Sequence, residues 1–364
     1  MKNIWAVSMV RNEEDIIESF CRYTLQYCDG LLIRDDNSVD HTGWIIKQLI
    51  TEGLQIVPFE TPLSGTSDFG RYQFDVFNDL ARMAFEERGA DWVIPLDADE
   101  FLFCPDYSDP RVEIEKLDES VDYRIYSRTY IFEEPPSDRS VFMPYQFQSF
   151  LRNPKEKRMV KTLLSRKLYF GSRAKISIGH HHIEFDADPH PNTELSASLL
   201  SAHYPFRSVE QMLAKVIIGE LNYKASLNRN NCGLHWNIMY DAIKKLQLAD
   251  SKLVRRFSLF YSGIFETDVD SQEPVETEPF RTDFLKEPIS LKYTNPQPYQ
   301  YAYLEKILAG MESIIENLKK RVSDYEQTKE DLDACRKQIV GIEKSCFRKI
   351  AGFFKRLLSF KSDF

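Results

Sequence analysis

Two carboxylates at alternate positions give the clearest chemical signal in the sequence. Asp97 and Asp99 directly follow the apolar run 92–96, with Ala98 between them. Because alternate side chains of an extended segment point to the same face, both carboxylates can meet one ligand. Close carboxylates raise each other's pKa unless a cation neutralises them. A hard divalent cation would do so, and it would hold a diphosphate at the same time.

Two further polar clusters also follow apolar runs. Residues 35–42 read DDNSVDHT after the run 30–34, and residues 10–14 read VRNEE at the end of the run 4–10. Their acidic and amide side chains can form hydrogen bonds with a base and a ribose. The alternative is a polar turn that ends in a helix cap, a role that suits Asp40.

The elements that must position these clusters alternate in type over the first hundred residues. Apolar runs predict strands, and helical spacing of apolar residues predicts helices between them. The predicted strands are 4–10, 30–34, 54–59 and 92–96, and the predicted helices are 13–28, 40–50 and 69–87. This alternation indicates an α/β fold with a parallel sheet, which binds ligands at the carboxyl ends of its strands.

The second part of the chain has a different pattern. Strands are expected at 123–132, 160–170 and 176–178, and helices at 209–224 and 235–248. We interpret this part as an extension of the sheet together with acceptor-side structure.

The three polar clusters, in this order, resemble the motifs of the family 2 glycosyltransferases. VRNEED resembles the family's opening "P-x-Y/R-N-E", DDNSVDHT resembles "DDGSTDGT", and WVIPLDADEF resembles the strand and DxD motif in the "lDaDEF" form of a bacterial subgroup. The matched motifs lie within residues 4–103. The resemblance implies a GT-A fold, which is a Rossmann-like, mostly parallel sheet flanked by helices. It also implies a nucleotide-diphosphate sugar donor and a divalent cation, Mn²⁺ or Mg²⁺.

The resemblance also implies roles for residues in the first two motifs. Asp35 or Asp36 would contact the nucleobase, and Arg11 and Glu13, with Val10, would line the nucleoside pocket. An acidic pair accepts hydrogen bonds from a base N–H, which favours a uridine diphosphate sugar.

At the third motif, the resemblance implies that Asp97 faces the ribose or the metal and that Asp99 holds the metal, with Ala98 beside the donor. A Gly-x-His pattern in the subgroup points to His181 as a further metal ligand. The chain departs from the family before the DxD motif, where Asn78 has no adjacent Arg, so Asn78 is given no role.

Basic residues supply further candidates outside the three motifs. Three consecutive histidines, 180–182, can complete a metal shell, or they can form a hydrogen-bonding cluster. Arg207 precedes a predicted helix and can donate to phosphate oxygens of the nucleotide sugar. Lys161 and Lys215 are weaker candidates, because a lone lysine is usually solvated.

The catalytic base has several candidates. An inverting transfer needs a carboxylate near the acceptor hydroxyl. Glu133, Glu134 and Glu184 follow predicted strands and suit this role, and Glu100 lies next to the metal motif but can point into the sheet. The sequence does not separate them.

Composition narrows the function classes. The net charge of −9 does not favour nucleic acid as a partner. The six cysteines form no CxxC pair, which is typical of free thiols in a reducing cytoplasm. The first apolar run is seven residues long and resembles a strand more than a signal peptide, and no run approaches the ~20 residues that span a bilayer.

The chain divides into five predicted regions. The first two regions form a GT-A domain at 1–265, with a nucleotide-binding half at 1–103 and an acceptor half at 104–265. A linker or wrapping arm at 266–300, a coiled-coil helix at 301–345 and a basic amphipathic tail at 346–364 follow. The coiled coil is expected from apolar positions that alternate in steps of four and three from Leu304, and it would pair chains into a homo-oligomer. One long helix packed on its own domain is the alternative.

Together these features predict a metal-dependent glycosyltransferase at the cytoplasmic face of the plasma membrane. It would move a sugar from a UDP-sugar to a glycan or lipid-linked acceptor in cell-surface polysaccharide synthesis. Two other functions are compatible with the same residues. They are a metal-dependent hydrolase, for which the DDNS motif is unneeded, and a non-catalytic scaffold of a glycan-assembly complex, for which the DxD motif is unneeded.

The tail 346–364 predicts reversible membrane attachment. Apolar residues recur there at three and four, among five basic residues and one acidic residue. Such a helix lies in a membrane interface, and each cation near an anionic surface contributes about 1 kcal/mol. We therefore expect the full-length protein to float with anionic liposomes at low salt and to be released at high salt. A chain that ends at Lys344 should stay in solution, and equal flotation of both would show that the tail is not the anchor.

Overall fold

The computed structural model describes residues 1–60, 69–131, 141–146, 149–150, 159–186, 190–225, 234–246, 251–261, 279–294, 302–324, 336–342, 344–345 and 348. The chain forms two compact units. The first comprises Met1–Ser64, Gly70–Met212 and Leu248–Ala302, and the second comprises Gly65–Phe69, Leu213–Gln247 and Tyr303–Phe364.

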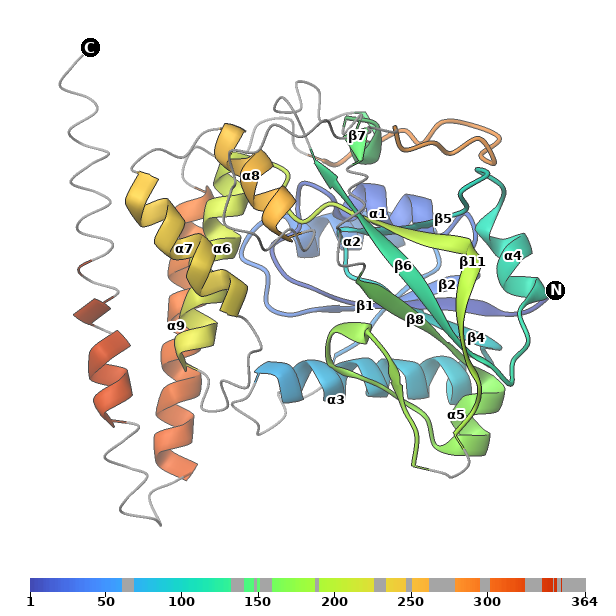
Figure 1. The fold of residues 1–364 in the computed structure, drawn as a ribbon, viewed down its shortest axis with the longest axis horizontal. Coiled ribbons are helices and arrows are strands. Elements are labelled where there is room, and N and C mark those ends of the chain that lie inside the picture. Colours follow the sequence, from blue (N-terminus) through green and yellow to red (C-terminus); the bar gives the residue numbers. More distant parts are fainter. Residues whose placement is uncertain are drawn as a thin grey trace. The chain divides into compact units, whose positions relative to one another are not determined.

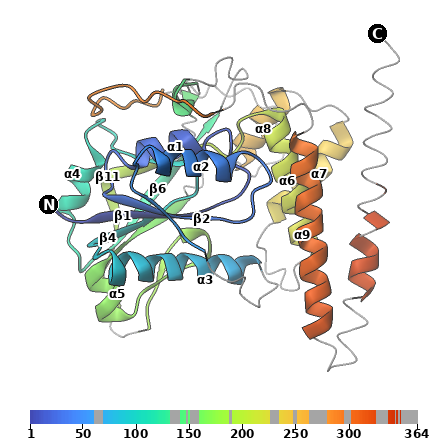
Figure 2. The same cartoon turned by 180° about the vertical axis from the view of Figure 1, so that it is seen from behind.

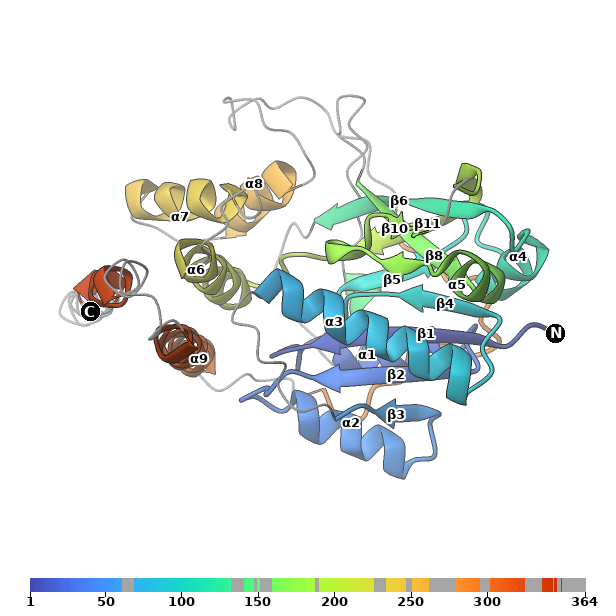
Figure 3. The same cartoon turned by 90° about the horizontal axis from the view of Figure 1, so that it is seen from below.

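The first half of the main sheet is parallel. Its order is β3 (Ile56–Pro58), β2 (Gly30–Asp35), β1 (Ile4–Val10) and β4 (Trp92–Pro95). In register, Val10 lies beside Asp35 and Val7 beside Pro95, so the three predicted motifs begin at neighbouring strand ends (Figure 3). β1, β2 and β4 are mainly apolar and buried, as expected of parallel strands covered on both faces, whereas the edge strand β3 is partly exposed.

The second half of the sheet is mixed and continues from β4 in the order β8, β6, β11 and β5. β8 pairs antiparallel with both β4 and β6, β11 runs parallel to β6, and β5 pairs antiparallel with β11. The strands of this half are β5 (Glu100–Phe103), β6 (Asp122–Ile131), β8 (Val160–Ser165) and β11 (Thr193–His203). The short strand β7 (Ser149–Phe150) pairs with β6. A separate two-stranded sheet is formed by β9 (Lys175–Ile176) and β10 (Ile183–Glu184).

Helices cover both faces of the sheet. α1 (Ile17–Thr24) and α2 (Thr42–Thr51) lie on one face, and α3 (Phe69–Arg82) and α5 (Arg166–Ser172) lie on the other (Figures 1 and 2). Apolar residues of α3, among them Phe77 and Leu80, form one buried cluster with residues of β1, β2, β4 and β8. The π-helical turn Met83–Glu87 continues α3. The helix α4 (Pro110–Lys116) is capped by Asp109, whose carboxylate accepts a hydrogen bond from the backbone N of Arg111. The predicted α/β class, a Rossmann-like sheet flanked by helices, is confirmed.

Some predicted elements differ from those observed. The segment 160–170, expected to be one strand, is β8 followed by α5. The change occurs at Ser165, whose Oγ accepts a hydrogen bond from the backbone N of Leu168 and caps the helix. The strand β11 and the helix α8 (Ser251–Tyr261) were not predicted. In the case of β11, the exposed beginning of the strand lacks a clear period-2 pattern.

The segment 279–294, in the predicted wrapping arm, is attached to the first unit through a buried carboxylate. Glu18 of α1 accepts hydrogen bonds from the backbone N of Lys292, Tyr293 and Thr294 at 2.8, 2.7 and 2.8 Å. Glu18 has no exposed surface, so these donors replace the water that the charge would otherwise need. The arm therefore packs on α1 at this point.

The second unit is helical and contains most of α6 (Val209–Ala225), α7 (Leu234–Leu246) and α9 (Ala302–Asp324). Leu221 of α6 and Ile314 and Leu318 of α9 form a buried cluster with Ile342. The expected helix from Leu304 is thus present up to Asp324, and its apolar face packs within its own unit. Pairing of two chains stays a prediction, and the tail lies outside the described residues except for Arg348.

None of the described helices is both long enough and apolar enough to cross a membrane.

Candidate active site

The loops that follow β1 and β2 are joined by backbone and side-chain hydrogen bonds. The backbone N of Asn12 donates to Ser38 Oγ at 2.8 Å, and Asn12 Oδ1 accepts from the backbone N of Val39 at 2.9 Å. The backbone N of Glu13 donates to Thr42 Oγ1 at 2.8 Å. Asn12 adopts a φ of 59°, a conformation that asparagine tolerates better than most residues. The two sequence motifs therefore form one preorganised surface.

The acidic pair of the second motif is held from two sides. Asp36 is buried, and its carboxylate accepts from Tyr72 Oη at 3.0 Å and pairs with Arg11 Nη1 at 3.5 Å. Asp35 packs against the beginning of α2 at Gly43, where a Cβ atom would lie 2.6 Å from Asp35 Oδ2. A side chain at position 43 would therefore displace this carboxylate from its present position.

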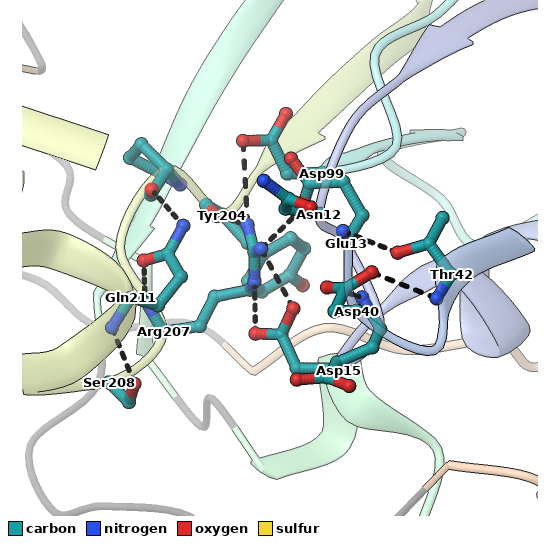
Figure 4. Close-up of polar contacts among 12 residues, drawn as sticks. Asn12, Glu13, Asp15, Asp40, Thr42, Asp99, Tyr204, Arg207, Ser208 and Gln211 are labelled. Carbon is teal, nitrogen blue, oxygen red and sulfur yellow. Dashed lines mark hydrogen bonds and ion pairs between the residues drawn. The ribbon is translucent and has the colours of Figure 1, made fainter. Parts of the chain in front are cut away.

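A buried guanidinium connects the end of β1 with the DxD motif. Arg207 is 2% exposed, and its Nε and Nη2 donate to the carboxylate of Asp15 at 2.8 and 3.0 Å. Nη2 also pairs with Glu13, and Nη1 lies 3.6 Å from Asp99 Oδ2 and donates to the backbone O of Tyr204 at 3.1 Å (Figure 4). Arg207 thus joins residues almost two hundred positions apart in the chain.

The guanidinium of Arg207 keeps its charge in this buried position. Burial lowers the pKa of the guanidinium, but Asp15 and Glu13 outweigh burial, so the net pKa lies above its ordinary value.

The other carboxylate of the DxD motif has its own buried cation. Lys161 Nζ of β8 lies 3.2 Å from Asp97 Oδ2, 2.8 Å from Glu100 Oε1 and 3.2 Å from the backbone O of Gly179. Burial raises the pKa of Asp97, but Lys161 outweighs it, so the net pKa lies below its ordinary value. Burial raises the pKa of Glu100, and there the lysine does not compensate fully.

One histidine lies beside the second carboxylate of the motif. His203, at the end of β11, places Nε2 at 3.6 Å from Asp99 Oδ1, and both side chains are buried. Two cis ligands of one small divalent ion, each about 2.1 Å from it, are about 3.0 Å apart, so these two side chains would close slightly around such an ion. In the described part of the chain, no group of three or more His, Cys, Asp or Glu could hold a metal ion. The pair could supply two ligands of an ion, and the remaining ligands would have to come from outside the pair.

The consecutive histidines have different surroundings. His181 Nδ1 lies 2.8 Å from the backbone O of Val160, and an Nδ1–H bond of this kind leaves Nε2 in the form that binds metals. His180 is buried against Phe77, with no hydrogen-bond partner for its ring nitrogens among the described residues, and burial lowers its pKa to about 3. The proposed metal contact of His181 stays a prediction.

The other predicted residues are placed as follows. Val10 and Ala98 are buried within or beside the strand ends, and Glu184 is exposed on β10. Glu133 and Glu134 lie outside the described residues. Asn78 has a structural contact, because its side chain donates to the backbone O of Ile176 and accepts from the backbone N of the same residue.

Sequence reasoning missed two residues of the site and misjudged a third. Asp15, the main partner of Arg207, ends the VRNEED run and had acidic neighbours as its only signal. Tyr72 was read as part of the surrounding helix. Lys161 was ranked as a weak candidate because a single lysine carries no signal of burial.

Comparisons with known proteins find similarity to solved structures. No family model and no curated protein sequence matches the chain. A mannosyltransferase of Pyrobaculum calidifontis in complex with GDP-mannose and Mn²⁺ is 13% identical over 72% of this chain and 73% of that chain, with a TM-score of 0.34. Glucosyl-3-phosphoglycerate synthase of Mycobacterium tuberculosis in complex with phosphoglyceric acid is 17% identical over 50% of this chain and 62% of that chain, with a TM-score of 0.25. Because these TM-scores are below 0.5, the function of the chain is argued from its own site.

The pairing at Arg207 predicts a large loss of stability when the guanidinium is removed. Arg207→Ala leaves Glu13, Asp15 and Asp99 without their shared buried cation. Breaking a buried ion pair on one side costs about 3–5 kcal/mol. We expect urea denaturation to show a loss of this size. Arg281→Ala, at an exposed Arg281–Asp283 pair, should cost under about 1 kcal/mol. Equal losses in the two variants would contradict the central role of Arg207.

Proposed function

We propose that the chain is a glycosyltransferase of the GT-A type that uses a nucleotide-diphosphate sugar. The observation that carries the proposal is the convergence of three carboxylate motifs at the ends of β1, β2 and β4, fixed by two buried cations. Ligands of open α/β sheets bind at this edge. A hydrolase or a scaffold would not require the joined loops that follow β1 and β2.

The donor would lie across the strand ends. Asp35 or Asp36 would accept from the base N–H, and Arg11 and Glu13 would line the nucleoside pocket, because their loops are joined by hydrogen bonds. Asp97, whose side chain is 36% exposed, would face the ribose or the cation. The order of the motifs along the sheet edge thus matches base, ribose and diphosphate.

Asp99 and His203 would hold a divalent cation beside the diphosphate, with Asp97 and His181 as further candidate ligands. When bound, Mn²⁺ or Mg²⁺ would neutralise charge on the leaving diphosphate, which is worth several kcal/mol. The acceptor, a glycan or lipid-linked sugar, would lose its proton to a carboxylate in an inverting reaction. Glu184, Glu133 and Glu134 remain the candidates for that base.

Nucleotide specificity gives the first test of this proposal. A ligand at about 100 times its Kd stabilises a protein by about 2.7 kcal/mol. We expect UDP with Mn²⁺ to raise the melting temperature by several degrees, and more than GDP, dTDP or ADP with Mn²⁺. The control is each nucleotide without Mn²⁺. A panel led by GDP would overturn the uridine preference, and a panel without any shift would overturn the donor site.

The cation site gives the second test. Asp99→Asn keeps the shape of the side chain and its contact with Arg207, but it removes the charge that would hold the cation. We expect the transfer rate to fall about a thousandfold, which corresponds to about 4 kcal/mol. Asp106→Asn, at an exposed position after β5, is the matched control and should keep the wild-type rate. Activity of Asp99→Asn within threefold of wild type would refute the assignment.

A further inference from the structure

The feature that the proposed donor site leaves unexplained is a buried lysine beneath the DxD motif. Lys161 is the second residue of β8, and β8 pairs with β4, the strand whose end carries Asp97. The side chain of Lys161 is 7% exposed, whereas that of Asp97 is 36% exposed. The ammonium group therefore lies on the protein side of Asp97, and the outer side of Asp97 faces solvent.

The surroundings of Lys161 argue against a role in binding phosphate. An ammonium group has three N–H donors. Nζ donates hydrogen bonds to Asp97 Oδ2 and to the backbone O of Gly179, both at 3.2 Å, and it forms an ion pair with Glu100 Oε1 at 2.8 Å. Because the ammonium group is buried and its contacts are two carboxylates and a carbonyl, its charge acts on the carboxylates.

The carboxylates beside Lys161 outnumber this one ammonium group. Asp97, Asp99 and Glu100 bring three carboxylates within four residues, and Glu100 has no exposed surface. Neighbouring carboxylates repel one another, and each lowers the cost of bringing a cation to the others. A resident cation on two of the three therefore reduces the attraction of the motif for a divalent ion.

We infer that Lys161 is a resident counter-ion that positions Asp97 and Glu100 and weakens divalent-cation binding at the DxD motif. The inference rests on the proposed function, in which the cation binds at Asp99 and His203. A site weakened in this way holds the ion firmly only when a diphosphate supplies further negative oxygens. Cation and donor would then bind together and leave together.

The test measures Mn²⁺ binding to the full chain, by the electron paramagnetic resonance signal of free Mn²⁺, without nucleotide and with UDP. Lys161→Gln should bind Mn²⁺ at least about sixfold more tightly than wild type without nucleotide, since a unit charge about 8 Å from a divalent ion changes its binding by about this factor even in a water-like dielectric. Lys161→Arg, which keeps the charge, should bind within about threefold of wild type. Lys167→Gln, with the same charge change at an exposed position of α5, is the matched control and should bind as wild type does.

A second variant protects the test against misfolding of Lys161→Gln. In Lys161→Gln/Glu100→Gln the buried charges are removed together, so the interior stays balanced. Because the loss of Glu100 also weakens cation binding, the reference for this variant is Glu100→Gln, which keeps Lys161, and the double variant should bind Mn²⁺ more tightly than Glu100→Gln by the same factor. A purely structural lysine predicts unchanged or weaker binding in both comparisons, and that result would overturn the inference alone. If wild type binds no Mn²⁺ even with UDP, the cation site of the proposed function fails as well.

Discussion

The ion pairing of the buried Arg207 is the interaction on which the candidate site depends. Its guanidinium holds Asp15 and Glu13, which follow β1, and lies beside Asp99 in the DxD motif. These acids could not lie so close together in a buried place without a shared cation, because their repulsion and desolvation would raise their pKa values. Arg207 lies between the end of β11 at His203 and the beginning of α6 at Val209.

The second buried cation, Lys161, has the same role on the other side of the motif. It enters from β8, on the far side of β4, and faces Asp97 and Glu100. The two cations thus hold the two aspartates of the motif separately. Both cations lie beneath the edge of the sheet and hold these carboxylates in place there.

The positions of the acidic motifs could be predicted from the sequence, because parallel strands place their carboxyl ends at one edge. The runs before Asp35 and Asp97 are apolar and short, so their strand type was clear. The partners of these acids could not be predicted. Arg207 and Asp15 are 192 residues apart, and nothing local in the sequence marks either as the partner of the other. Ser165 likewise ends β8 through a side-chain cap that the apolar pattern of 160–170 hides.

A crystal structure of the protein with UDP and Mn²⁺ tests the central claim most directly, with the ion located by its anomalous scattering. We expect the uracil beside Asp35 or Asp36, the ion on Asp99 and His203 and bound to the diphosphate, and Arg207 and Lys161 in their present contacts. A nucleotide bound away from the ends of β1, β2 and β4, or an ion that displaces Lys161 from Asp97, would contradict that claim.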